Sequence, residues 1–233
     1  MITTIAFDAD DTLWHNERIF LAAKEKYSLL LAGYHDREWV EQRLDDAESR
    51  NILHFGYGIK GFTLSMIETA CELTEGRVTG TEIREIIGFA REMLSAPIEV
   101  LDGVHETIQA LAPNYSLMVV TKGDLFDQEA KLARSGLGDY FGRVEIVSKK
   151  IKATYQEILD RNNIRPNEFL MVGNSLRSDI LPVLELGARA VYVPYETEWF
   201  HEKVSDDELM DKDFATLSSV AELPLWITRD SRP

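Results

Sequence analysis

Three acidic residues stand close together near the start of the chain, directly after a short apolar segment. Asp8, Asp10 and Asp11 follow residues 2–7, and Thr12 comes next. Alternation of side chains along an extended segment places Asp8 and Asp10 on the same side. Carboxylates this close repel one another unless a cation neutralises them, and an oxygen-binding divalent ion such as Mg²⁺ suits the pair. The pattern therefore indicates either a magnesium site or an acidic, solvated turn.

Polar groups also follow three later apolar segments. A threonine and a lysine suit a phosphate, a lysine cluster supplies positive charge, and an amide with a nearby acid supplies oxygen ligands for a hard cation. These groups are Thr121 and Lys122; Lys149, Lys150 and Lys152; and Asn174 with Asp179. Each group alone is more often structural than functional. Together they indicate one site if the segments are neighbouring strands, because parallel strands bind ligands at their carboxyl ends.

Strand and helix patterns alternate through the chain after Pro97. Runs rich in valine and isoleucine predict strands, and apolar residues at helical spacing predict helices between them. The predicted strands are 116–121, 144–147, 169–174 and 188–194, and the predicted helices are 103–111, 125–135, 152–162 and 178–186. Residues 2–7 are expected to join the same sheet, and 214–227 to add an edge strand and a closing helix. This alternation predicts an α/β fold, a Rossmann-like parallel sheet with helices on both faces.

The segment between the first strand and Pro97 has a helical pattern throughout. Four helices are expected, over residues 18–32, 36–53, 62–73 and 83–94. Thr79 and Glu82 have the spacing of a capping box before the last of them. Met66 and Cys71 are expected in the core of this helical part. We therefore expect a Rossmann-like core of residues 1–14 and 97–233, and a helical insert of residues 15–96.

The composition narrows the choice of partners and compartment. The chain has 25 Lys and Arg against 40 Asp and Glu, a formal net charge of −15. Such a charge repels nucleic acids and anionic lipid head groups, so neither is expected as a partner. Cys71 is the single cysteine and cannot form an internal disulfide, and no apolar run approaches the length of a membrane-spanning helix. We expect a cytoplasmic protein.

The four polar clusters resemble the motifs of the haloacid dehalogenase superfamily, whose phosphatases use an aspartate as nucleophile. The first motif is Asp-x-Asp-x-Thr after a strand, and the others are a Thr or Ser, a lysine, and a Gly-Asp-x-x-x-x-Asp segment. In order, they match Asp8, Asp10 and Thr12; Thr121; a lysine of 149–152; and residues 173–179. The helical insert resembles the family's C1-type cap.

The resemblance implies a Mg²⁺-dependent phosphatase that hydrolyses a small phosphomonoester through an aspartyl-phosphate. Asp8 would be the nucleophile, and Asp10 would act as general acid and base. The implied metal ligands are Asp8, Asp10 through its backbone carbonyl, Asn174 and Asp179. The implied phosphate-binding residues are Thr12, Thr121 and Lys122.

Two positions of this match leave a choice open. Lys150 is favoured as the charge-neutralising lysine because it lies just before the helix expected to begin near Lys152, whereas Lys149 keeps the family's usual spacing to Tyr155. Asn174 stands where the family has a metal-binding aspartate. An amide oxygen can still bind Mg²⁺, but it brings no negative charge.

Other functions fit the sequence less well. Dehalogenases of the same superfamily attack carbon and lack a carboxylate at the second position, so Asp10 favours phosphoryl transfer. A receiver-like signalling domain would carry its phosphorylated aspartate near residue 55, where residues 50–60 contain none. A non-catalytic scaffold that binds phosphate and Mg²⁺ stays an alternative, which an assay of turnover would separate from an enzyme.

The helical insert contains a glycine-rich segment, residues 56–61, with the formal spacing GxGxxG. It follows a helix rather than a strand, so the dinucleotide-binding interpretation fails. The segment is either a plain connection between two helices or a loop whose Tyr57 and Lys60 contact the leaving group of the substrate. We expect that substrate to be a small phosphorylated metabolite, while the sequence leaves its identity and the oligomeric state open.

Overall fold

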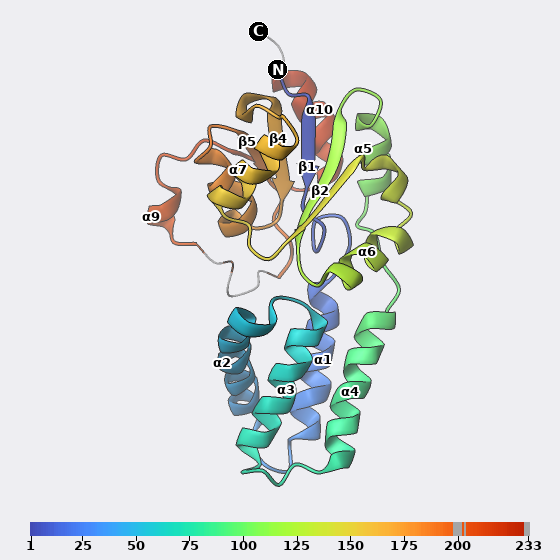
Figure 1. Cartoon of the computed structure of the whole chain (residues 1–233), viewed down its shortest axis with the longest axis vertical. Helices are drawn as coiled ribbons and strands as arrows, with labels where there is room; N and C mark the ends of the chain where they lie inside the picture. Colours follow the sequence, from blue (N-terminus) through green and yellow to red (C-terminus); the bar gives the residue numbers. More distant parts are fainter. Residues whose placement is uncertain (198–201, 203, 231–233) are drawn as a thin grey trace. The chain divides into compact units, whose positions relative to one another are not determined.

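The computed structural model describes residues 1–197, 202 and 204–230, and the chain divides into two compact units. The first unit contains residues 1–15, 98–122 and the chain from 128 onward. The second contains residues 16–97 together with the short segment 123–127, which the sequence places with the sheet. Figure 1 shows the strands of the first unit and the four long helices of the second.

A six-stranded sheet forms the centre of the first unit, and all of its strand pairs are parallel. The spatial order is β3-β2-β1-β4-β5-β6. The strands are β1 (Thr4–Phe7), β2 (Ser116–Lys122), β3 (Arg143–Val147), β4 (Phe169–Gly173), β5 (Arg189–Tyr192) and β6 (Ala215–Thr216). In register, Phe7 at the end of β1 is opposite Val119 of β2 and Val172 of β4. The predicted Rossmann-like α/β fold is confirmed, and β1 lies at the centre of the sheet.

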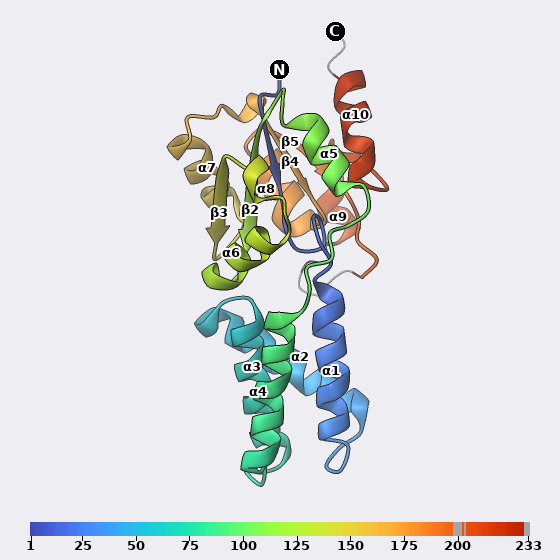
Figure 2. The same ribbon diagram turned by 90° about the vertical axis from the view of Figure 1, so that its right-hand side faces the viewer.

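The central strands β1 and β4 are buried on both faces, and alternate residues enter two different cores. Ile5 and Phe7 of β1 belong to one buried cluster, with residues of the helices α5 (Val104–Leu111) and α10 (Leu223–Asp230). Ala6 belongs to the other, with residues of α7 (Lys152–Arg161) and α8 (Leu181–Leu184). Figure 2 shows α7 on one side of the strands and α5 and α10 on the other. Burial on both faces explains why these strands have continuous apolar sequences.

Most helices of the first unit lie close to their predicted ranges, whereas the short helix over Asp206–Leu209 was not predicted. They are α5 (Val104–Leu111), α6 (Leu125–Arg134, whose first residues belong to the second unit), α7 (Lys152–Arg161), α8 (Leu181–Leu184), α9 (Asp206–Leu209) and α10 (Leu223–Asp230). The helix predicted over 178–186 differs most. It begins earlier, with the π-helical turn η3 (Leu176–Ile180), because the Ser175 side chain accepts a hydrogen bond from the Ser178 amide and starts the turn there.

Four helices make up most of the second unit and pack around their own apolar core. They are α1 (Glu17–Leu30), α2 (Arg37–Phe55), α3 (Ile59–Leu73) and α4 (Gly80–Ser95). The capping box predicted from Thr79 and Glu82 is present at the start of α4. Met66 is fully buried, as expected, but the expectation for Cys71 was wrong: its side chain is exposed, because it lies on the outer side of α3.

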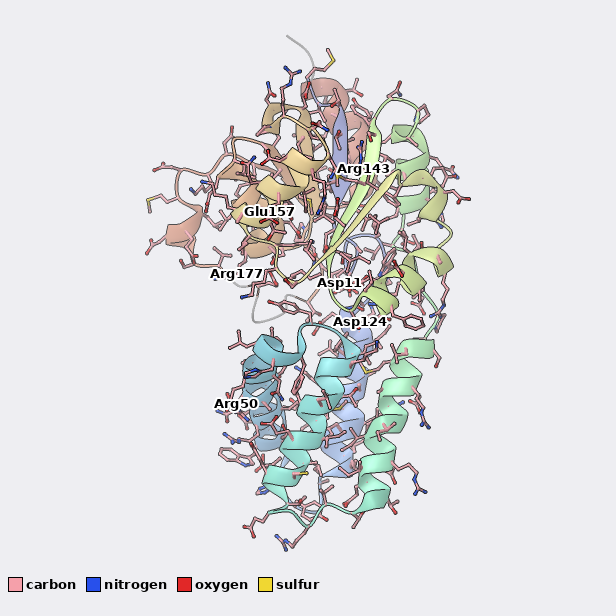
Figure 3. All side chains as sticks on the ribbon, viewed as in Figure 1. Asp11, Arg50, Asp124, Arg143, Glu157 and Arg177 are labelled. Atoms are coloured by element: carbon pink, nitrogen blue, oxygen red, sulfur yellow. The ribbon has the colours of Figure 1, made fainter. Side chains whose placement is uncertain are left out.

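Charged side chains cover the outside of the α2–α3 pair. Arg50, labelled in Figure 3, contacts Glu68 and Glu72 of the neighbouring helix at 3.2 and 3.3 Å. Such exposed pairs contribute little stability each. None of the helices in the described part of the chain is long and apolar enough to cross a membrane.

Glu48 of α2 is an exception, because its carboxyl group is buried inside the helical unit. One of its oxygens has no hydrogen-bond partner in the described structure. Burial raises the pKa of Glu48 to about 7 from its ordinary value of 4.5; Lys24 opposes the rise and Asp45 adds to it. The folded state therefore holds this proton more tightly than the unfolded state, so stability falls as pH rises from about 4.5 to 7.

We expect the Glu48→Gln variant to be more stable than the wild type by about 3 kcal/mol at pH 8, since a pKa difference of this size corresponds to that free energy. At pH 4 the two proteins should be equally stable, because both carry a neutral group. Denaturant unfolding at several pH values measures the difference. Glu85→Gln, at an exposed position of α4, is the control and should show no such pH-dependent gain. A difference that is constant from pH 4 to 8 would contradict the prediction.

Candidate active site

Three charged residues meet at the carboxyl ends of β1, β3 and β4. The Nζ atom of Lys150 donates to Oδ1 of Asp8 and, at 2.7 Å, to Oδ1 of Asp179. All three side chains are buried, with Lys150 only 1% exposed and Asp179 fully enclosed. Among the three candidate lysines, Lys150 makes this contact, whereas the side chains of Lys149 and Lys152 are exposed.

The charges of this cluster do not balance. Burial lowers the pKa of Lys150, but Asp179 and Asp8 outweigh it and raise the pKa above its ordinary value. Burial raises the pKa of Asp8 to about 7, although the Lys150 ammonium opposes the rise. One ammonium facing two carboxylates keeps Lys150 charged and leaves an excess of negative charge. The cluster can therefore take up a further cation or a proton.

The position of Asp179 depends on a glycine at the end of β4. A Cβ atom on Gly173 would lie 2.3 Å from Oδ2 of Asp179, so no side chain fits there. The same Oδ2 accepts a hydrogen bond of 3.0 Å from the Ser175 backbone amide. The turn after β4 thus fixes the carboxylate of Asp179 and aims its other oxygen at Lys150. Both oxygens of this predicted metal ligand are engaged by the protein.

Asn174 and Thr12 lie together although they are 162 residues apart in the sequence. The Thr12 hydroxyl donates to Oδ1 of Asn174 at 3.2 Å. Asn174 follows β4, and Thr12 lies in the loop after β1, the strand next to it. Asp11 in the same loop, labelled in Figure 3, has a positive φ of 61°. The tight loop after β1 thereby brings the first and fourth sequence motifs together.

Asp10 is held by three donors that the sequence did not identify as site residues. Its carboxylate accepts from Nε1 of Trp14 at 2.8 Å, from Nε2 of Gln128 at 2.7 Å and from Nζ of Lys131 at 3.1 Å. Gln128 and Lys131 lie on one face of α6, and both are buried. Their spacing of three residues was the available signal, because it places a lysine and an amide side by side on a helix.

Lys122 has a different surrounding from that of Lys150. Its ammonium donates to the carboxylate of Glu202 and, at 2.9 Å, to the hydroxyl of Ser178. Glu202 also accepts from the hydroxyls of Ser175 and Ser178. Thr121, one residue earlier, is buried at the end of β2. No sequence signal pointed to Glu202, which is 80 residues from Lys122 in the sequence.

The two predicted residues of the helical insert lie in the second unit. Lys60, in the first turn of α3, donates to Oδ1 of Asp124 at 2.8 Å and lies 5.5 Å from the ring centre of Phe126. Asp124 is labelled in Figure 3, and this contact lowers its pKa. Tyr57 lies between α2 and α3. Their contact with a leaving group stays a prediction.

The donor atoms near Asp8 suit magnesium. The carboxylates of Asp8 and Asp179 and the amide of Asn174 offer oxygen atoms, which hard cations prefer. The excess negative charge of the buried cluster also favours a cation there. Within the described residues, no three His, Cys, Asp or Glu side chains are placed to hold a metal by themselves. A bound Mg²⁺ would therefore keep some of its water or bind substrate oxygens, as this ion usually does.

Several known proteins are similar to this chain. A phosphatase of 5-amino-6-(5-phospho-D-ribitylamino)uracil from Escherichia coli, YigB, is 24% identical over 208 residues, covering 82% of this chain and 83% of that protein. A glyceraldehyde 3-phosphate phosphatase from Pyrococcus furiosus is 29% identical over 238 residues, covering 96% of this chain and 90% of that protein. The crystal structure of a haloacid dehalogenase-like family hydrolase from Xanthomonas campestris matches with a TM-score of 0.87 and 40% identity, covering 98% of this chain and 91% of that chain.

The similarity extends to a whole family. Haloacid dehalogenase-like hydrolases match residues 2–187, which contain β1 to α8 and every predicted site residue. Of the residues that resemble the family's motifs, Asp8, Lys150 and Asp179 meet at the strand ends. The chain therefore belongs to the haloacid dehalogenase-like hydrolases.

Proposed function

We propose that this hydrolase is a phosphatase that removes the phosphoryl group from a small phosphomonoester through an aspartyl-phosphate on Asp8. The buried contact of Lys150 with Asp8 and Asp179 carries the proposal. It holds a carboxylate, a cation and an oxygen-rich loop together at one edge of the sheet. A nucleophilic carboxylate next to a fixed positive charge is what attack on an anionic phosphorus centre needs.

The relatives support activity on a phosphomonoester. Both the bacterial and the archaeal relative are named as phosphatases of small phosphorylated molecules. The second carboxylate, Asp10, favours the same reaction over attack on carbon. A small phosphorylated metabolite is therefore the proposed substrate, and the helical unit is the proposed cap. We propose that the protein acts in the cytoplasm.

In the proposed reaction, an oxygen of Asp8 attacks phosphorus as the bond to the leaving oxygen breaks. Asp10 gives a proton to that leaving oxygen and then takes one from the water that hydrolyses the aspartyl-phosphate. Thr12, Thr121 and the Lys122 amide bind the phosphoryl oxygens, and Lys150 neutralises charge on them. Gln128 and Lys131 position the carboxylate of Asp10. The products are an alcohol and inorganic phosphate.

Magnesium is the proposed cofactor. Asp8, the backbone carbonyl of Asp10 and the amide oxygen of Asn174 would hold it. When bound, it would supply positive charge that keeps Asp8 ionised and neutralises the phosphoryl oxygens. Asp179, whose two oxygens already contact Lys150 and Ser175, would act through water or as the counter-ion of Lys150.

A screen of phosphomonoesters with and without Mg²⁺ tests the proposed function. We expect release of inorganic phosphate from p-nitrophenyl phosphate and from at least one small metabolite, and loss of this activity when the metal is removed by a chelator. Binding of inorganic phosphate without turnover of any phosphomonoester would instead support the non-catalytic scaffold.

The amide of Asn174 leads to a prediction about metal affinity. Asn174→Asp should lower the Mg²⁺ concentration for half-maximal activity by about tenfold, because hard cations are held largely by ligand charge. Calorimetric titration of Mg²⁺ measures the same change without turnover. Asn167→Asp, just before β4, is the control and should leave the affinity unchanged. Equal affinities in the wild type and Asn174→Asp would place this side chain outside the metal site.

A further inference from the structure

The carboxylate of Glu202 lies beside the candidate active site among three donor side chains. These are Lys122, Ser175 and Ser178, which we call the cradle. One oxygen of the Glu202 carboxylate accepts from the ammonium of Lys122, and the other accepts from the hydroxyls of Ser175 and Ser178, the latter at 2.5 Å. Both serines are buried, and the side chain of Glu202 is only 13% exposed. The structure thus contains a carboxylate bound by one cation and two hydroxyl groups.

The hydrogen bonds within the cradle make it selective for an anion. Oγ of Ser175 accepts from the Ser178 backbone amide at 2.9 Å, and Oγ of Ser178 accepts from Lys122 at 2.9 Å. Each serine has one hydroxyl proton, and with its oxygen already accepting, that proton points to Glu202. The cradle therefore offers three donors to its ligand. Charge-assisted hydrogen bonds of this kind are the strong ones.

The cradle shares its backbone with the proposed phosphoryl site. Lys122 follows Thr121 directly, and Ser175 follows Asn174. The Ser175 amide also holds the carboxylate of Asp179, which contacts Lys150. Lys122 and Ser175 are therefore sequence neighbours of residues that we propose to bind the phosphoryl group and the metal. A ligand held by Lys122 and Ser175 would lie next to that site.

We propose that Lys122, Ser175 and Ser178 form a subsite for a carboxylate of the substrate, and that Glu202 occupies this subsite when no substrate is bound. The proposal rests on the proposed phosphatase function and narrows its substrates to phosphomonoesters that also carry a carboxylate. Glu202 competes with them from within the chain. Tethering gives it a high effective concentration, so it lowers the apparent affinity for such substrates.

Two substrates of nearly equal size test the proposal. 3-Phosphoglycerate carries a carboxylate where glycerol 3-phosphate carries a hydroxymethyl group. In Glu202→Ala we expect the KM for 3-phosphoglycerate to fall about tenfold, because the competitor is removed. The KM for glycerol 3-phosphate should change less than twofold. In Lys122→Met the KM for 3-phosphoglycerate should rise at least tenfold, with a smaller change for glycerol 3-phosphate.

Asp207→Ala is the matched control, because Asp207 is an exposed acid of the same part of the chain. It should leave both KM values unchanged. An equal fall of both KM values in Glu202→Ala would report only the loss of a negative charge near the site, and an equal loss of activity on both substrates would report a structural role. Either result would overturn the proposal.

Calorimetric binding of 3-phosphoglycerate to the wild type and Glu202→Ala separates this proposal from the proposed function. Tighter binding to Glu202→Ala without any turnover of p-nitrophenyl phosphate would refute the phosphatase function while supporting the subsite. Turnover of p-nitrophenyl phosphate with equal binding to both proteins would refute the subsite and keep the phosphatase function.

Discussion

Replacement of Asp8 by asparagine is expected to abolish Mg²⁺-dependent phosphatase activity, with kcat reduced at least ~10⁴-fold. An amide oxygen cannot attack phosphorus to form the acyl phosphate, so the first chemical step is lost. The fold should persist, because asparagine has the same shape and removes a charge from a buried, unbalanced cluster. Release of phosphate from p-nitrophenyl phosphate measures kcat, and thermal unfolding should show a Tm no lower than that of the wild type.

Asp11→Asn is the control for this experiment. Asp11 is a buried acid of the same loop, and asparagine tolerates its left-handed backbone conformation well. Its activity should stay within a few-fold of the wild type. Asp10→Asn gives a third comparison, with slow turnover but retained phosphate binding, because the proton transfers are lost and the nucleophile remains. More than 1% of wild-type kcat in Asp8→Asn would remove Asp8 from the proposed role.

Replacement of Lys150 by methionine is expected to damage both stability and activity. The change leaves Asp8 and Asp179 buried without their shared cation, and breaking a buried ion pair in this way costs about 3–5 kcal/mol. Activity should fall at least ~10²-fold, because the positive charge next to the transferring group is lost. Denaturant unfolding and kcat/KM for p-nitrophenyl phosphate measure the two effects.

Two variants separate these effects. Lys149→Met removes the exposed neighbouring lysine and should change neither quantity appreciably. Lys150→Met combined with Asp179→Asn should recover about half of the lost stability, since one of the two uncompensated charges is gone, but none of the lost activity. If Lys149→Met causes the larger loss in kcat/KM, the charge-neutralising role belongs to Lys149, as the spacing to Tyr155 allows.

The sheet was predictable because each strand is defined by local sequence. Residues 5–7 and most positions of the later valine-rich runs are apolar, which indicates strands buried on both faces. That residues 2–7 join this sheet followed from the lack of any neighbouring strand in the sequence, whereas the central place of β1 was not predicted. The helix after β4 was less predictable. Its start depends on a hydrogen bond that the Ser178 backbone amide donates to the Ser175 side chain, and that interaction leaves no periodic pattern.

The candidate site residues that lie at strand ends were the easiest to predict. Asp8, Thr121 and Asn174 are found in this way, because the ends of parallel strands come together. The choice between Lys149 and Lys150 depends on the path of a loop after β3, which consecutive lysines do not reveal. Lys131 and Glu202 reach their partners through tertiary packing over 121 and 80 residues. Local spacing can place Gln128 beside Lys131 on a helix, but it does not reveal such distant partners.

The central position of β1 also affects how the chain can fold. β1 leaves the ribosome before the other strands, and its two neighbours, β2 and β4, begin only at Ser116 and Phe169. The four helices α1 to α4, which lie between β1 and β2 in the sequence, are dominated by local contacts, which form quickly. Parallel pairing of strands over such separations is slow. A nascent chain therefore carries an apolar strand without partners while the helices are already formed. Asp8 and Asn174 come together only after β4 has been synthesised, so no shorter nascent chain contains a complete site.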